Sequence, residues 1–354
     1  MNRDNNHRES RELETASRLS DWYRENRRDL PFREGRDPYR IWVSEIMAQQ
    51  TRMEAVIPYY DRFMDRFPSL QDLAEAPEER VLEAWAGLGY YSRARNLHTT
   101  ARILWEERKG EFPGSAQELK MLPGIGEYTA GAIASIAFGR PEPAVDGNVL
   151  RVYARVTNRE DNTASPAFRR ETAAWTRKIL EEGRPETLTQ AIMELGALIC
   201  IPGTPRCGKC PLQDLCQGYA SGDPGRLPAP AVRKEKPVSH FAVIYLKDSQ
   251  GNVLLRKRTE SLLKGMWQYL MLAGDTEPNR IQTILRQQGF ITGEILPVGT
   301  GRHVFSHRIW QMRGYRCTLI SPPPDILPEG YHFVEPERLR ELPFPAAFRF
   351  LSTT

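Results

Sequence analysis

The chain has 354 residues, a length that allows about two domains. Hydrophobic residues make up 40% and charged residues 27%, which is typical of a globular protein with buried cores. No apolar run approaches the roughly 20 residues of a membrane helix, and the polar residues 1–14 lack the apolar segment of a secretory signal. We therefore expect a cytoplasmic protein without a membrane partner. The net charge of +4 permits a nucleic-acid partner without indicating one.

Residues 11–220 are predicted to be almost wholly helical. Apolar residues recur there at the spacing of three to four that one helix face requires, and short segments with Pro or Gly separate these runs. The expected helices are 13–23, 41–51, 56–67, 81–85, 94–108, 129–138, 149–156, 168–180 and 188–200.

The composition changes after residue 220. Pro, Gly and charged residues dominate positions 221–237, which predicts an interdomain linker. Runs of β-branched and aromatic residues follow, and the first two of them predict a hairpin of residues 240–247 and 253–258. Further strands are expected at 267–272, 302–305, 309–318 and 332–334, with one helix at 280–288. We therefore predict two domains, an all-α domain of residues 1–220 and a smaller α+β domain of residues 238–354.

Four of the five cysteines lie between residues 200 and 216. A secreted protein with disulfides would spread its cysteines along the chain, whereas this cluster indicates a metal centre in a reducing compartment. Cys200, Cys207, Cys210 and Cys216 have the spacing C-x6-C-x2-C-x5-C. Zinc and an iron–sulfur cluster are both compatible with four thiolates, and the single x2 pair favours the cluster. Cys317 stands alone and is expected to be a core thiol.

Residues 122–129, LPGIGEYT, predict a tight turn between two helices. Gly124 and Gly126 let the backbone approach a ligand closely, and the free amides of the next helix would bind an anion such as a DNA phosphate. An ordinary turn between helices has the same residue types, so this motif alone leaves both interpretations open.

Two carboxylates elsewhere in the predicted helical domain also stand out. Asp146 precedes a predicted helix, where an N-cap is the default role of an aspartate. Glu45 lies in an apolar helix, where its side chain either reaches solvent or occupies a pocket that raises its pKa.

Two further segments, WVSEIMAQQT at 42–51 and WAGLGYYSRARNLH at 85–98, carry a resemblance to a known family. These segments are followed in the sequence by the turn between two helices at 122–129, by Asp146 and by the cysteine loop. With these features in this order, residues 30–216 resemble the MutY-type adenine DNA glycosylases. These are helix-hairpin-helix enzymes of the endonuclease III superfamily. The second domain resembles their Nudix-like C-terminal domain.

The resemblance implies a base excision repair glycosylase, a hydrolase that acts as a monomer on double-stranded DNA at the bacterial nucleoid. Its substrate would be adenine mispaired with 8-oxoguanine or guanine, and its cofactor a [4Fe–4S] cluster on the four clustered cysteines. The adenine must leave the base stack to be reached. Glu45 would then be the general acid, Asp146 the anion that stabilises the sugar cation, and Tyr128 a hydrogen-bonding partner of one of them. The implied DNA-binding residues are Gln50, Leu88, Tyr90, Gly124, Gly126, Phe305, Ser306 and His307.

Two features refine this expectation. Relatives that cut the DNA strand carry a nucleophilic lysine where this chain has Tyr128, so we expect a monofunctional enzyme that leaves an abasic site. The helix at 280–288 lacks the glutamates that a Nudix hydrolase uses to bind Mg²⁺. The second domain is therefore expected to recognise 8-oxoguanine through Phe305, Ser306 and His307, although three such residues also occur at an ordinary strand end.

The chain departs from the family pattern at Phe32, where tryptophan is common, and at Ala48, where leucine is common. Both changes concern packing and not charge chemistry. Two alternative functions remain, an endonuclease III-like enzyme for oxidised pyrimidines and a DNA-binding protein without activity. Tyr128 and the second domain argue against the former, and the presence of Glu45 and Asp146 argues against the latter.

Overall fold

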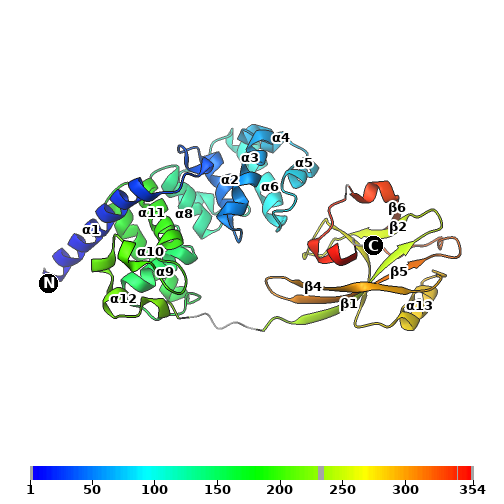
Figure 1. The fold of residues 1–354 in the computed structure, drawn as a ribbon. Helices are drawn as coiled ribbons and strands as arrows, with labels where there is room; N and C mark the ends of the chain where they lie inside the picture. The colour runs from blue at the N-terminus through cyan, green and yellow to red at the C-terminus, as the bar shows by residue number, and fades with distance from the viewer. Residues whose placement is uncertain (1–2, 230–234, 341, 352–354) are drawn as a thin grey trace. The chain divides into compact units, whose positions relative to one another are not determined.

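The computed structural model describes residues 3–229, 235–340 and 342–351, and the chain divides into two compact units, residues 1–232 and 233–354 (Figure 1). The first unit is helical and the second contains a sheet, which confirms the predicted fold class. Within the described ranges, no helix is both long and apolar enough to cross a membrane.

All the predicted helices of the first unit are present, with differences at their ends. Three further helices, of six or four residues, were too short for periodicity to reveal. The helices are α1 (Arg3–Asn26), α2 (Pro38–Ala48), α3 (Met53–Arg66), α4 (Leu70–Glu75), α5 (Glu78–Ala84), α6 (Ser92–Arg108), α7 (Ala116–Leu119), α8 (Glu127–Ile136), α9 (Gly147–Val156), α10 (Pro166–Glu181), α11 (Pro185–Leu198) and α12 (Gln217–Ala220).

Helix α2 lies inside the first unit. Asp37 caps its start by accepting a hydrogen bond from the Tyr39 amide at 2.9 Å, and Pro38 supplies a backbone already suited to a first helical turn. Seven of its eleven residues are buried, among them Trp42, which packs edge-to-face on Phe112 at 5.5 Å. This burial on most sides fixes the helix and explains why its sequence is apolar all round.

The first unit extends further along the chain than predicted. Residues 221–229 belonged to the expected linker, yet Leu227 is only 2% exposed and its carbonyl accepts a hydrogen bond from Arg155 Nε at 3.0 Å. Ala229 forms a β-bridge with Asn162. The start of the predicted linker therefore packs on the helical unit, because buried groups there supply partners that composition does not reveal. Residues 230–234 of the predicted linker lie outside the described residues.

The second unit contains a mixed six-stranded sheet in the order β4-β5-β1-β3-β2-β6. Apolar side chains alternate between its faces: Ile244 packs with Leu285 of α13 on one face, and Val243 packs with Trp310 on the other. The elements are β1 (Val238–Lys247), β2 (Val253–Lys257), β3 (Trp267–Ala273), α13 (Pro278–Gln287), β4 (Leu296–Val304), β5 (Ile309–Thr318) and β6 (Tyr331–Val334).

The predicted hairpin of residues 240–258 is wrong beyond its turn. Strands β1 and β2 pair only at Lys247 and Val253, and β3 lies between them over the rest of their length. Strand β1 instead runs parallel to β5 from Val238–Ile309 to Lys247–Thr318. Because β1 is central and largely buried, partners distant in sequence occupy both of its edges, and a local turn signal does not reveal them.

Candidate active site and metal centre

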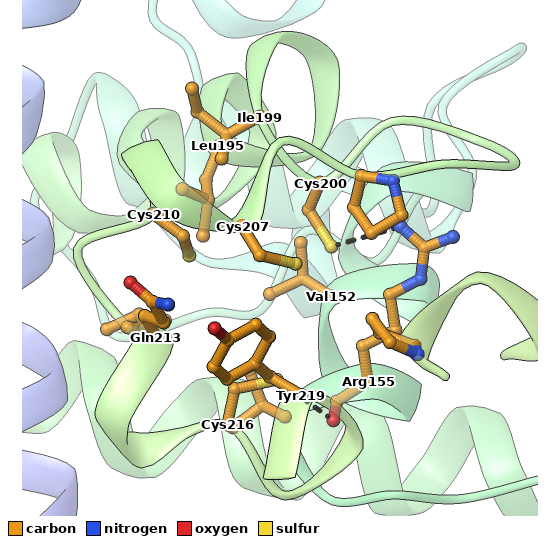
Figure 2. A pocket seen from close by; sticks show the side chains of 14 residues that line it. Val152, Arg155, Leu195, Ile199, Cys200, Cys207, Cys210, Gln213, Cys216 and Tyr219 are labelled. Carbon is orange, nitrogen blue, oxygen red and sulfur yellow. Dashed lines mark hydrogen bonds between the residues drawn. The ribbon is translucent and has the colours of Figure 1, made fainter. Parts of the chain in front are cut away.

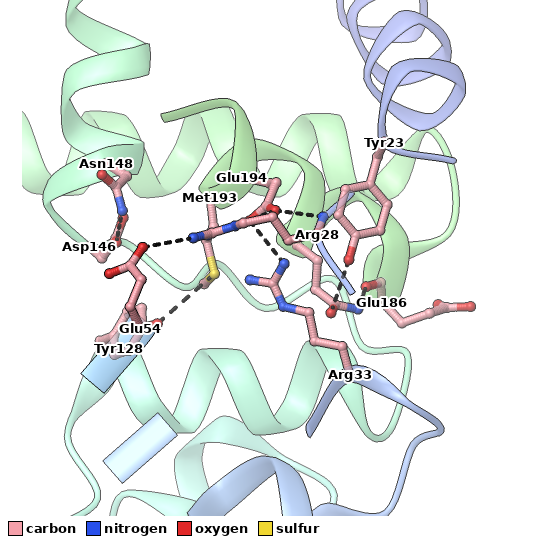
Figure 3. Close-up of polar contacts among 11 residues, drawn as sticks. Tyr23, Arg28, Arg33, Glu54, Tyr128, Asp146, Asn148, Glu186, Met193 and Glu194 are labelled. Carbon is pink, nitrogen blue, oxygen red and sulfur yellow. Dashed lines mark hydrogen bonds and ion pairs between the residues drawn. The ribbon is translucent and has the colours of Figure 1, made fainter. Parts of the chain in front are cut away.

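Glu45, Tyr128 and Asp146 line one pocket of the first unit. They come from α2, from the first turn of α8 and from the residue before α9. The structure thus brings together the three side chains that the sequence predicted to be catalytic. Figure 3 shows Tyr128 and Asp146 on one side of this pocket, with Met193 beside them.

The Tyr128 hydroxyl donates a hydrogen bond to Glu45 Oε2 at 2.6 Å. Burial raises the pKa of Glu45, and the nearby charge of Asp146 raises it further. The hydrogen bond from Tyr128 and the charge of Arg33 act in the opposite direction without cancelling the effect of burial. Glu45 therefore occupies a pocket, as one of the two sequence interpretations required, and its carboxyl group is suited to hold a proton.

Asp146 is both a helix cap and a pocket residue. It accepts hydrogen bonds at 2.8 Å from the Val149 amide and from Asn148 Nδ2. Burial raises the pKa of Asp146, while these hydrogen bonds and the charge of Arg151 favour its anion. The two interpretations of Asp146 are thus compatible, because a cap at the start of α9 also directs a carboxylate into the pocket.

A third carboxylate in this pocket, Glu194 of α11, was missed by the sequence reasoning. It is fully buried and accepts hydrogen bonds from Arg28 Nε at 2.8 Å, Arg28 Nη2 at 2.9 Å and Arg33 Nη1 at 3.0 Å (Figure 3). Burial alone would raise its pKa, yet the two arginines lower the pKa of Glu194 to about 2. The only sequence signal was an acidic residue within an apolar helix, the same signal that drew attention to Glu45.

The rest of the pocket lining includes apolar side chains. Phe32, Ala48, Met53, Met193 and Ala197 line it. The two departures from the family pattern therefore lie at the pocket itself. The lining also includes seven charged side chains, so the pocket combines apolar surface with many charged groups: Arg28, Arg33, Glu45, Arg52, Glu54, Asp146 and Glu194.

The residues expected to enter the DNA stack lie at two turns. Gln50 and Tyr90 have left-handed backbones, with φ angles of 58° and 50°, and Tyr90 is 50% exposed. Leu88 differs, because it is only 8% exposed and belongs to the apolar core of the first unit. In this conformation Gln50 and Tyr90 are accessible to a ligand, and Leu88 is not.

The turn before α8 contains two glycines with different surroundings. Gly124 has a φ angle of +77°, and a Cβ atom there would lie 2.6 Å from Asn96 Cβ, so only glycine fits. Gly126 precedes the first turn of α8, and a Cβ atom there would meet nothing within 4 Å. The amides at the start of α8 are therefore open to a ligand.

The four clustered cysteines surround one pocket, together with apolar side chains such as Val152 and Leu195 (Figure 2). Within the described ranges, no three Cys, His, Asp or Glu side chains are placed to hold a single metal ion. Zinc would need all its thiolates about 2.3 Å from one centre. Zinc and iron–sulfur clusters both use four thiols as ligands, so the donor type is compatible with either centre.

Arg155 of α9 holds the first turn of the cysteine loop. It is 1% exposed and donates hydrogen bonds to the carbonyls of Ile201 at 2.7 Å and Gly203 at 3.0 Å, while Nη1 lies 3.5 Å from Cys200 Sγ. The Arg155 carbonyl accepts a hydrogen bond from Cys216 Sγ at 3.3 Å. The loop is thereby attached to the core of the first unit.

Helix α9 connects the cysteine loop to the candidate active site. Arg151 donates hydrogen bonds to the Cys200 carbonyl at 2.7 Å and to Asn148 Oδ1 at 2.8 Å. Asn148 in turn donates to Asp146. A continuous set of hydrogen bonds therefore joins the two sites over two turns of one helix.

In the second unit, Phe305, Ser306 and His307 form the turn between β4 and β5. The Phe305 amide donates to the Arg308 carbonyl at 2.9 Å, and the Phe305 ring packs edge-to-face on Trp310 at 4.9 Å. Ser306 and His307 are exposed. The aromatic side chain anchors the turn and leaves the two polar side chains accessible.

Models of two protein families match the chain. The first, described as HhH-GPD superfamily base excision DNA repair protein, matches residues 43–178, which include Glu45, Tyr128 and Asp146. The second, described as NUDIX domain, matches residues 242–353.

Relatives match over both units. The adenine DNA glycosylase of Buchnera aphidicola subsp. Schizaphis graminum (strain Sg) is 33% identical over 296 residues, which are 82% of this chain and 83% of that protein. This chain belongs to the adenine DNA glycosylase family. Other members include the adenine DNA glycosylase of Mus musculus, which is 45% identical over 222 residues, or 60% of this chain. That match spans only 43% of the mouse protein, so the chain covers less than half of the length of this relative.

Solved structures show the same fold in the first unit of this adenine DNA glycosylase family member. A thermostable thymine-DNA glycosylase is 27% identical and superposes with a TM-score of 0.54 over 60% of this chain and 98% of its own. An endonuclease III from a non-covalent DNA complex reaches a TM-score of 0.50 at 23% identity, over 59% of this chain and 94% of its own.

Proposed function

We propose that this chain hydrolyses the bond between adenine and deoxyribose in double-stranded DNA where adenine lies opposite 8-oxoguanine or guanine. The observation that supports this most strongly is the pocket in which burial raises the pKa of Glu45, within reach of Tyr128 and together with Asp146. Family membership supports adenine as the base that is released.

The two carboxylates have complementary roles in this reaction. Adenine is a poor leaving group, so Glu45 donates a proton to it, most effectively at N7. The C1′–N9 bond then breaks, and the sugar becomes a cation that the Asp146 carboxylate stabilises. Water adds to C1′ and loses a proton, which leaves an abasic site.

Tyr128 orients the general acid. Its hydroxyl group donates to Glu45 Oε2 and leaves the other carboxyl oxygen for the proton that is transferred. A tyrosine offers no amine that could form a Schiff base with the sugar. The enzyme is therefore monofunctional and does not cut the DNA strand.

Binding of the extruded adenine involves three surfaces of the first unit. Its pocket offers the flat base apolar surface from side chains such as Met53 and Met193, and the start of α8 after Gly124 and Gly126 binds a phosphate. Gln50 and Tyr90 fill the space that the base leaves in the stack, and Leu88 supports them from the core.

The cysteine pocket holds a [4Fe–4S] cluster, with Cys200, Cys207, Cys210 and Cys216 as its ligands. The donor set supports this assignment, because four thiols line one pocket and their spacing, with a single x2 pair, favours a cluster over zinc. When bound, the cluster would cross-link the four cysteines of this loop and add to the hydrogen bonds that attach it to α9.

The second unit, from residue 238, recognises the opposite base. Ser306 and His307 are exposed on a turn that Phe305 anchors, and each offers hydrogen-bonding groups to 8-oxoguanine. Helix α13 carries no acidic residue, so this unit recognises a base and is not a Mg²⁺-dependent hydrolase.

We place the enzyme, as a monomer, in the bacterial cytoplasm at the nucleoid.

The proposal is tested by incubating the protein with duplexes that carry adenine opposite 8-oxoguanine, guanine or thymine. We expect release of adenine, fastest opposite 8-oxoguanine, with strand breaks only after treatment with alkali. Strand breaks without alkali would contradict the monofunctional mechanism. Release of oxidised pyrimidines alone would indicate an endonuclease III-like enzyme, and binding without any base release would indicate a DNA-binding protein.

A further inference from the structure

Arg93 lies in the first turn of α6, and it is only 9% exposed. Its guanidinium group donates hydrogen bonds to the backbone carbonyls of five residues. The distances are 2.9 Å to Ile46, 2.9 Å to Met47, 2.7 Å to Gln49, 3.3 Å to Leu88 and 3.2 Å to Gly89.

These carbonyls belong to two turns that are about forty positions apart in the sequence. Three of them are at the C-terminal end of α2, the helix that carries Glu45, where helix carbonyls lack partners within the helix. The other two are in the turn before α6. The residue that follows each set, Gln50 or Tyr90, has a left-handed backbone. Such a conformation persists in a residue with a side chain only where the surroundings fix it.

Aromatic rings hold the guanidinium group in its orientation. Its central carbon lies 5.3 Å from the Trp85 ring centroid and 5.5 Å from that of Tyr90. Burial lowers the pKa of Arg93 to about 10, so the group remains charged at neutral pH. In the part of the chain that the structure describes, Arg93 forms no ion pair, and its five hydrogen bonds go to backbone carbonyls. Its planar fork can bridge both turns at once, which the single ammonium group of a lysine cannot do.

We propose that Arg93 is a positioning residue for base flipping: it fixes the spacing of the turns that carry Gln50 and Tyr90, so that both side chains enter the DNA stack together. This inference rests on the proposed function. It assigns Arg93 no contact with the reacting atoms, and its loss should therefore slow extrusion of the base more than the cleavage that follows.

The test compares Arg93→Lys in the full chain with the control Arg102→Lys. Arg102 is an exposed residue of the same helix, and its Nε atom lies 3.0 Å from Glu106 Oε1. Single-turnover excision is measured on a paired duplex and on one whose adenine lies in a short bubble of unpaired bases, where flipping costs less. We expect Arg93→Lys to slow excision about tenfold on the paired duplex and less than about twofold in the bubble. Arg102→Lys should match the wild type on both substrates.

The ratio of the two rates does not depend on the fraction of correctly folded enzyme, so partial unfolding of the variant does not obscure the result. A second measurement needs no chemistry: with Glu45→Gln in the background, the fluorescence of 2-aminopurine at the adenine position reports extrusion, and Arg93→Lys should reduce its increase. Equal slowing on both substrates, or an unchanged fluorescence increase, would overturn the inference. Absence of excision by the wild-type protein would instead refute the proposed function.

Discussion

At the scale of single residues, burial raises the pKa values of the two proposed catalytic carboxyl groups, Glu45 and Asp146. Glu45 must be protonated, so the rate should fall as the pH rises through its elevated pKa. Asp146 must be ionised, so the rate should also fall as the pH drops through the pKa of Asp146. We expect a bell-shaped profile of the single-turnover rate against pH. Glu194, with a pKa of about 2, stays ionised and contributes neither limb. A rate that rises steadily with pH would show that Glu45 is not the acid.

In the proposed function, Tyr128 accounts for the absence of strand cutting. The substitution Tyr128→Lys would place an amine beside Glu45, near the position of the sugar. We expect this variant to gain strand-cutting activity through a Schiff base, which borohydride traps as a covalent protein–DNA complex. Tyr128→Phe is the control and should form no such complex. Failure to trap any complex with Tyr128→Lys would mean that this side chain does not reach C1′.

The sequence predicts single residues well where their signal is local. Glu45, Asp146 and Tyr128 each lie in a short motif, and the structure brings them into one pocket. Glu194 lies in no such motif, and Arg93 lies in the segment 85–98 without a signal of its own, because each of them bonds to partners more than forty positions away. Only folding makes those contacts visible.

At the scale of elements, we expect the cysteine loop to depend on the proposed cluster. Among the described residues, hydrogen bonds join α9 to the cysteine loop near the two ends of the loop, at residues 200–203 and at Cys216. Purified protein should contain about four iron and four sulfide ions per chain. Cys207→Ser should lose the iron and lower the melting temperature, whereas Cys317→Ser, a buried thiol of the other unit, should keep the iron. Stoichiometric zinc without iron in protein prepared anaerobically would refute the cluster assignment.

The helices follow from sequence more closely than the sheet does. Each long helix carries its own periodic pattern, and its start is often marked by a cap such as Asp37 or Asp146. The positions of the strands are also close to those predicted, except that β4 begins at Leu296, whereas the predicted strand began at Arg302. Their order is not as predicted, since β3 separates β1 from β2 and β1 pairs with β5 across the chain. Strand order depends on pairing between distant segments, and no local pattern encodes it.

At the scale of the whole molecule, the proposed function assigns the two bases of the mispair to different units. Undamaged adenine is a normal base, so the signal for repair must come from the base opposite to it. The double substitution Ser306→Ala with His307→Ala should reduce the preference for adenine opposite 8-oxoguanine over adenine opposite guanine. Each lost hydrogen bond is worth about 1–3 kcal/mol, or roughly 5- to 150-fold in discrimination. Excision itself should persist, because the pocket of the first unit is unchanged.

Both substrates are compared for this variant under single-turnover conditions at one salt concentration, since binding to DNA depends strongly on salt. Ser321→Ala, in another loop of the second unit, is the control. An unchanged preference in the double variant would place the recognition of 8-oxoguanine elsewhere and leave the turn between β4 and β5 with a structural role.

The proposed chemistry is tested most directly by the single-turnover rate of adenine release by Glu45→Gln on a duplex that carries adenine opposite 8-oxoguanine. Glutamine keeps the shape of the side chain and cannot act as an acid. The rate should fall about 10²- to 10⁴-fold relative to the wild type, while the affinity for the duplex stays within about twofold. Glu79→Gln, an exposed change on α5, should leave the rate unaltered. A Glu45→Gln variant that releases adenine at the wild-type rate would contradict the assignment of Glu45 as the general acid.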